Sequence, residues 1–162
     1  MTSLKPLLPE RPSAEYNFLV LALKDPEGAK PTIRLLDPED FYCRGFRTLF
    51  EVMRKMIDED QCLSITSLQE SVAQCGLLDR VGGRNFFAIL SGSVAGPDPF
   101  LDCERAAGLM KDAALIRKLI ALSLDAIRKA FDPYCDAQHL LGQVRLRLGE
   151  LAEACRPNGG GR

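Results

Sequence analysis

Few residues in this sequence are spaced in a way that could support catalysis or metal binding. The single histidine, His139, has no cysteine or second histidine at ligand spacing, so we expect a solvated or half-buried side chain. The acidic run Asp58-Glu59-Asp60 could hold a metal ion, but a short acidic run after a helix is more typical of a solvated loop. We therefore predict no metal site and no cofactor.

The sequence also lacks the common motifs for nucleophilic catalysis and phosphate binding. It contains no G-x-S-x-G and no G-x-G-x-x-G, and the dipeptide Gly-Lys never occurs, which excludes a Walker A loop. Gly82-Gly83 could imitate a phosphate-binding turn, but the residues around it predict helix–turn–helix and not strand–loop–helix. We expect a chain that catalyses no reaction itself.

The charge balance argues against a protein that works by binding nucleic acid. Lys plus Arg number 21 and Asp plus Glu number 22, which gives a net charge of −1, whereas tight DNA binding needs a concentrated basic surface. Arg44, Arg47, Arg54 and Lys55 form only a modest basic face, with no exposed aromatic residue among them for base stacking. We expect weak or no direct DNA binding.

Cysteine spacing and hydropathy predict a cytoplasmic protein. The six cysteines are all at least 13 residues apart and form no C-x-x-C pair, so we expect free, buried thiols instead of a zinc site or a disulfide framework. The longest apolar run, Phe18 to Leu23, has six residues, which is too short for a membrane span or a signal sequence. No membrane association is predicted.

The elements that position these residues are predicted to be helices. Ser13 is a candidate N-cap, and Glu15 falls in the first turn of a helix that runs to about Leu23 and stops at the turn signal Asp25-Pro26-Glu27-Gly28. The apolar residues of this segment cover every side, which predicts the most buried helix. A buried strand is the alternative, because short apolar runs do not separate the two.

Two further helices and a paired-glycine turn follow. Asp37-Pro38-Glu39-Asp40 predicts a helix start, with one apolar face that continues from Phe46 to Ile57. Thr66-Ser67-Leu68-Gln69 has the pattern of a capping box that opens the next helix. Gly82-Gly83 predicts a tight turn, and residues 92–97 predict a flexible break.

The last third has the pattern of two long helices joined by a short link. From about Asp98 to Phe131, apolar residues repeat at alternating steps of four and three, and a second helix from Asp136 repeats this spacing. Such a pair predicts an antiparallel helical hairpin. The predicted seam between its two helices consists of Met110, Ile120, Ile127, Leu141, Val144 and Leu148.

A second apolar stripe on the first of these helices predicts a second neighbour. Leu115, Leu119 and Leu122 lie off the seam, and leaving three leucines in water would forgo roughly 5–8 kcal/mol of burial. We favour a second chain as the cover, because the rest of the protein already fills its own core. The residues predicted for self-association or partner binding are Leu115, Leu119, Leu122, Arg117, Leu140 and Arg147.

The predicted fold class is all-α, a compact multi-helix bundle followed by a long antiparallel helical hairpin. The predicted domain organisation is a flexible N-terminal tail over 1–11, a helical bundle body over 12–97, the hairpin over 98–155, and a linker or frayed C-terminus over 156–162.

An ordered set of short motifs resembles the N-terminal domain of bacterial replicative DNA helicases, the DnaB-like family. The resemblance covers residue 9 to about residue 155, and Asp-Phe-Tyr followed by the Leu-Asp-x-Val-Gly-Gly turn is its most specific part. The motifs are Pro9, Ala14-Glu15, Asp40-Phe41-Tyr42, Arg47-x-Leu49-Phe50, Thr66-x-Leu68, Gly76-Leu77-Leu78-Asp79-Arg80-Val81-Gly82-Gly83 and Arg117-x-Leu119-Ile120.

This resemblance implies a non-catalytic domain that acts in assembly and docking. In such helicases the hairpins pair between subunits, the hexamer's collar forms as a trimer of dimers, and the collar docks a DnaG-type primase; a helicase loader is a further possible partner. The sequence departs from the family at Ser13, Phe46 and Ser64, which bears on surface contacts more than on the fold. The family's ATP-hydrolysing motor does not occur in these 162 residues.

Two other functions fit the same resemblance. One is a free-standing adaptor or inhibitor that copies this domain and competes for primase or helicase. The other is the helicase-binding domain of a primase, which shares the architecture, although the segment from Gly76 to Gly83 favours the helicase side.

Overall fold

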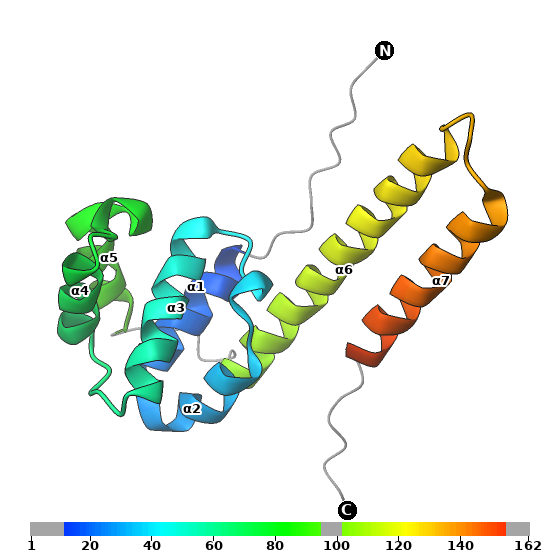
Figure 1. The fold of residues 1–162 in the computed structure, drawn as a ribbon. Helices are drawn as coiled ribbons and strands as arrows, with labels where there is room; N and C mark the ends of the chain where they lie inside the picture. Colours follow the sequence, from blue (N-terminus) through cyan, green and yellow to red (C-terminus); the bar gives the residue numbers. More distant parts are fainter. Residues whose placement is uncertain (1–11, 95–101, 155–162) are drawn as a thin grey trace, which may run out of the picture. The chain divides into compact units, whose positions relative to one another are not determined.

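The computed structural model describes residues 12–94 and 102–154, and these are helical with no β-strand among them (Figure 1). The all-α prediction is confirmed. The elements are α1 Pro12–Lys24, α2 Pro26–Leu35, the short 3-10 helix η1 Pro38–Asp40, α3 Arg44–Asp58, α4 Ile65–Gln74, the 3-10 helix η2 Leu78–Val81, α5 Gly83–Val94, α6 Cys103–Ala130 and α7 Ala137–Ala154.

The chain forms two compact units, the body, which ends at Ala114, and the hairpin unit, which begins at Leu115. Their boundary lies inside α6, whereas the sequence placed it near residue 97. The reason is packing, because Ala106, Ala107 and Met110 of α6 belong to the hydrophobic core of the body. The predicted tail, residues 95–101 and the predicted C-terminal linker lie outside the described residues.

The core of the body is built around α1, as its all-round apolar pattern predicts. Phe18, Leu19 and Ala22 are fully buried. The Phe18 ring lies 6.2 Å from the rings of both Phe41 and Phe50, in the edge-to-face geometry that aromatic pairs favour. The segment is therefore a helix, and the alternative of a buried strand is wrong.

The helix α2 was missed by the sequence analysis, which interpreted Asp25-Pro26-Glu27-Gly28 only as a stop. Asp25 is the N-cap of α2, and its Oδ1 accepts a hydrogen bond from the Gly28 backbone N–H at 3.0 Å. The similar pattern at 37–40 produces only the single turn η1, where Asp40 Oδ2 accepts from the Asp37 N–H at 2.9 Å. The long helix α3 begins later, at Arg44.

The cap of α4 also lies two residues before its predicted position at Thr66. Ser64 is the N-cap, because its Oγ accepts from the Ser67 N–H at 3.1 Å while Ser67 Oγ accepts from the Ser64 N–H at 2.9 Å. The predicted tight turn at Gly82-Gly83 is confirmed by their φ angles of 100° and 71°, a left-handed region that glycine adopts without strain.

No helix within the described ranges is long and apolar enough to span a lipid bilayer.

Candidate interaction surface of the hairpin

The hairpin unit consists of α6 from Leu115 onward and α7, joined by a loop over residues 131–136. Near this loop the two helices are closely packed, and the space left between them is a cavity of only about 10 Å³. Leu122 is the most buried side chain here, at 8% exposed. The residues that line this contact are Leu122, Asp125, Ala126, Lys129, Leu140, Gln143, Val144 and Arg147.

A cluster of charged residues around Asp125 of α6 includes an ion pair with α7. Its carboxylate lies 2.8 Å from Arg128 Nη2, 3.0 Å from Lys129 Nζ and 3.6 Å from Arg147 Nη1 of α7. Hydrogen bonds from Lys129 and then Arg128 lower the pKa of Asp125. A lowered pKa means that the ion pairs persist at neutral pH and are lost only as the pH falls through that lowered pKa.

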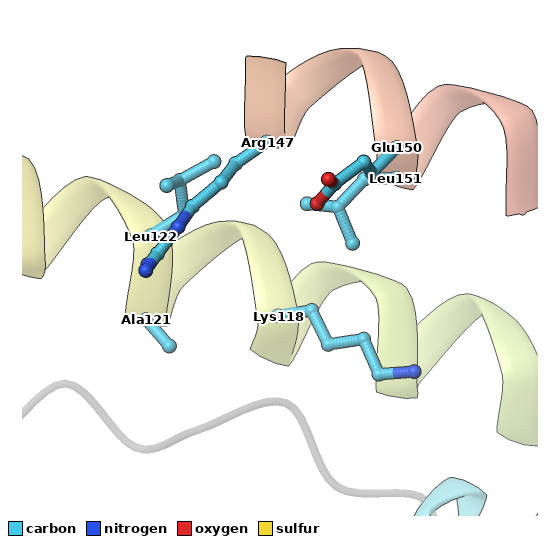
Figure 2. Close-up of a pocket in the computed structure, with 6 residues that line it drawn as sticks. All are labelled: Lys118, Ala121, Leu122, Arg147, Glu150 and Leu151. Carbon is cyan, nitrogen blue, oxygen red and sulfur yellow. The ribbon is translucent and has the colours of Figure 1, made fainter. Parts of the chain in front are cut away.

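Farther from the loop, a cavity of about 360 Å³ lies between the two helices (Figure 2). From α7, Leu151 and Glu150 point toward α6, and Arg147 reaches across the space. The base is apolar and the rim is charged. The lining residues are Lys118, Ala121, Leu122, Arg147, Glu150 and Leu151.

More large apolar side chains remain exposed on the hairpin unit than on the body. On α7, Leu141 and Leu148 are seven residues apart and therefore share one side of the helix. Four of the set lie on α6, two in the loop and three on α7. The exposed residues are Ile116, Leu119, Leu124, Ile127, Phe131, Tyr134, Leu141, Leu146 and Leu148. A patch of this kind on a small unit is typical of an interaction site.

The residues predicted for self-association are found in three environments. Leu119 is 43% exposed, whereas Leu115 and Arg117 are half-buried. Leu122, Leu140 and Arg147 line the contact between α6 and α7, and the Arg147 side chain is also 56% exposed.

The residues predicted for the hairpin seam also lie in different environments. Met110 lies in the core of the body, Ile120 is half-buried, and Val144 lines the α6–α7 contact. Ile127, Leu141 and Leu148 are exposed. The side of α6 that meets α7 carries Leu122, Asp125 and Lys129. Successive residues of a helix are turned by about 100° about its axis, so the predicted seam residues of α6 lie on a different side of the helix.

Sequence reasoning missed the two aromatic residues in the hairpin loop. Phe131 is 84% exposed and Tyr134 is 95% exposed, the highest values among the large apolar side chains described. Both flank Asp132-Pro133. The sequence contains a signal for their exposure, because aromatic residues in a proline-containing loop have no helix face through which they could be buried.

Two of the basic residues of α3 have structural partners, which adds to the prediction of weak DNA binding. Arg47 Nη2 donates to the Phe41 carbonyl at 2.9 Å, and Arg54 Nη1 donates to the Leu36 carbonyl at 3.2 Å. We therefore expect no binding tighter than about 1 µM to single-stranded or duplex DNA at physiological salt. Fluorescence anisotropy with labelled oligonucleotides measures this, and sub-micromolar binding would contradict it.

The thiols of the described residues are free, and they differ in expected reactivity. Cys62 and Cys75 are exposed and Cys43, Cys103 and Cys135 are half-buried, so the expectation of buried thiols is wrong for the described cysteines. Burial, with the charges of Asp102 and Asp25, raises the pKa of Cys103 from 9.0 to about 11. Cys103 should therefore react with iodoacetamide roughly 100-fold more slowly than an ordinary exposed thiol, because two pKa units change the thiolate fraction a hundredfold.

Mass spectrometry of a labelling time course tests the order of modification, which should begin with Cys62 and Cys75. Adding reductant should leave the thermal midpoint unchanged; a drop of several degrees would instead indicate a disulfide.

Comparison with known proteins gives a consistent set of matches. A family model described as the DnaB-like helicase N terminal domain matches residues 7–103. The replicative DNA helicase DnaB of Rhodothermus marinus is 23% identical over 145 residues, covering 90% of this chain and 15% of the relative. The DnaB of Geobacillus stearothermophilus is 21% identical over 145 residues, covering 90% of this chain and 31% of the relative. The chain thus spans less than a third of the length of these relatives.

A solved structure shows the same fold. The crystal structure of the N-terminal domain of DnaB helicase from Mycobacterium tuberculosis matches with a TM-score of 0.75 at 16% identity, covering 88% of this chain and 98% of that chain.

Proposed function

Because this chain belongs to the family of DnaB-like helicase N-terminal domains, we propose that it is the non-catalytic assembly domain of a replicative DNA helicase and acts in DNA replication. The proposal is supported by the replicative helicases that align with it over 90% of its length. It is also supported by the fold shared with an isolated N-terminal domain. In this proposal ATP hydrolysis belongs to a separate motor domain of the helicase.

Assembly proceeds by self-association through the hairpin unit, as part of a hexameric collar. The observation that carries this proposal is the exposed apolar surface on both α6 and α7, with Leu119, Leu141 and Leu148 among its members. Burying a fully exposed leucine contributes roughly 1.5–3 kcal/mol, and each of these partly exposed leucines contributes a share of that value when a second copy covers it. The body, by comparison, exposes only Leu35, Tyr42 and Ile89 among its described large apolar residues.

Light scattering across a range of protein concentrations tests self-association directly. We expect the molar mass to rise from that of one chain, 17.9 kDa, toward twice this value as the concentration increases. A mass that stays at one chain up to the highest soluble concentration would contradict the assembly role.

The second part of the proposal is docking of a DnaG-type primase, with a helicase loader as a further candidate partner. It rests on family membership. Calorimetric titration with the helicase-binding region of a primase should show saturable binding, and its absence would remove this part while leaving self-association intact. If the chain instead inhibits an intact helicase by competing for primase, the alternative of a free-standing adaptor or inhibitor would replace the assembly role.

A further inference from the structure

A series of hydrogen-bonded side chains crosses the α6–α7 contact beside the hairpin loop. Lys129 Nζ of α6 donates a hydrogen bond to Gln143 Oε1 of α7 at 3.2 Å. Gln143 Nε2 lies 2.9 Å from Nε2 of His139, on the same helix. Lys129 also pairs with Asp125 at 3.0 Å. The only histidine of the sequence therefore lies at one end of this series, and Asp125 lies at the other.

The position of the proton on His139 follows from the bond between Lys129 and Gln143. An ammonium group has N–H donors and no acceptor, so the oxygen of the Gln143 amide must face Lys129. The amide nitrogen, which only donates, then faces His139. This hydrogen bond requires a lone pair on His139 Nε2. A neutral imidazole with that lone pair carries its proton on Nδ1.

Protonation of His139 would place two donors face to face. Gln143 could turn its amide over and accept a hydrogen bond from the imidazolium, but the amide nitrogen would then face the Lys129 ammonium. In either arrangement one of the two hydrogen bonds is lost. In the second arrangement the lost bond is the one that joins α6 to α7.

We propose that His139 is a proton-sensitive element of the hairpin unit, which weakens the α6–α7 contact when its imidazole takes up a proton. The relay needs the neutral ring, so its contribution is present above the range in which histidine ordinarily titrates, about pH 6.5, and is lost as the pH falls through it. The ring is exposed, so a proton reaches it directly from water. The inference concerns a single copy and does not depend on the proposed self-association.

The charged groups around His139 come from both helices and from the loop. Asp136 Oδ1 accepts a hydrogen bond from the His139 backbone N–H at 3.2 Å. Hydrogen bonds from Lys129 and then Arg128 lower the pKa of Asp125, so its ion pairs persist while a histidine titrates. Carboxylates, lysine and arginine ordinarily keep their charge in that range. The charged residues near the relay are Asp125, Arg128 and Lys129 of α6, Asp136 at the start of α7, and Arg147 of α7.

Nitrogen NMR on isotopically labelled protein tests the assigned tautomer, because the chain has a single imidazole to observe. At about pH 7.5, where histidine is ordinarily neutral, Nε2 should give the signal of an unprotonated nitrogen and Nδ1 that of a protonated one. In Gln143→Leu the ring loses its donor, and the preference for the proton on Nδ1 should disappear. A wild-type ring that carries its proton on Nε2 would overturn the proposal.

Amide hydrogen exchange measures the effect on the hairpin. Between about pH 7.5 and about pH 5.5, protection factors over Ala137–Ala154 should fall about threefold, the size expected for the loss of one hydrogen bond. Helix α3 is the control within the same sample and should show no such fall. His139→Gln keeps an acceptor but cannot titrate, so it should abolish most of the fall. Unchanged protection in the wild type, or an equal fall in His139→Gln, would overturn the proposal.

Gln143→Glu reverses the expected sign. A carboxylate accepts from Lys129 and from a protonated His139 at the same time, so protection over α7 should rise on acidification instead of falling. Circular dichroism checks that the variant keeps its helices. If Gln143→Glu lost protection on acidification as the wild type does, His139 would not act through residue 143, and the proposed relay would be wrong.

Discussion

Replacing Glu15 with alanine should cost about 2–6 kcal/mol of folding free energy, since each of two backbone N–H groups that loses its acceptor costs about 1–3 kcal/mol. The Glu15 carboxylate is 1% exposed, and it accepts hydrogen bonds from the backbone N–H groups of Tyr42 at 2.8 Å and Cys43 at 3.1 Å. Alanine would leave both N–H groups without these acceptors where α3 begins. A loss of this size is a large share of the stability of an ordinary domain.

Urea denaturation followed by circular dichroism measures this effect. Glu27→Ala is the matched control, because Glu27 is exposed and pairs only with Lys30 at 2.7 Å, so its removal should change stability little. Glu15→Gln should lie between the two, since the amide keeps one acceptor oxygen but no charge. If Glu15→Ala were as stable as Glu27→Ala, the carboxylate would not be holding the start of α3.

The second large effect is expected at Leu119. Leu119→Asp should give a folded monomer, with the dimer dissociation constant raised at least 100-fold. The reason is that a two-fold interface contains the residue twice, and each copy would bury a carboxylate in place of an apolar side chain. Sedimentation equilibrium or light scattering measures the association, and circular dichroism measures the fold.

Leu35→Asp is the control for this variant, because Leu35 is exposed on the body and should not affect association. If Leu119→Asp loses its helical signal, Leu119 belongs to the internal packing of the protein. If the variant stays folded and the dimer persists, the self-association surface lies elsewhere.

The sequence predicts the fold class well, because most of the helices have a recognisable cap and a regular spacing of apolar residues. The helix α1 has an all-round apolar pattern, and it forms the centre of the body core. The exception, α2, contains Pro31 in its interior, and a proline there normally ends a helix. Burial of Ala29 and Ile33 against the core holds this segment helical, and such tertiary packing cannot be read from local pattern.

The candidate site was harder to predict for a different reason. The helix α6 is apolar on more than two sides, so periodicity alone could not choose which side meets α7. The contact that forms uses the small Ala126 together with Asp125 and Lys129. Hydrophobic spacing gives no weight to charged residues such as Asp125 and Lys129, and it therefore assigns the exposed Leu141 and Leu148 to the seam.

The short motifs that carry the family resemblance have structural roles in the body. Glu15 of Ala14-Glu15 bonds to the chain at Tyr42 and Cys43. Phe41 packs 4.8 Å from Phe50, ring centre to ring centre, and Arg47 binds the Phe41 carbonyl. These motifs therefore identify the family through its folding requirements, and the residues proposed for assembly lie outside most of them.

The single helix α6 runs from Cys103 to Ala130, through the boundary between Ala114 and Leu115. A gene fusion or deletion that separated the body from the hairpin would have no linker to cut. It would end the body in the middle of a helix, and the last four carbonyl groups of that helix would lose the backbone N–H groups that donate to them. Any protein engineered to keep only one of the two units therefore needs a new helix end at this boundary, with a cap after Ala114 for the body.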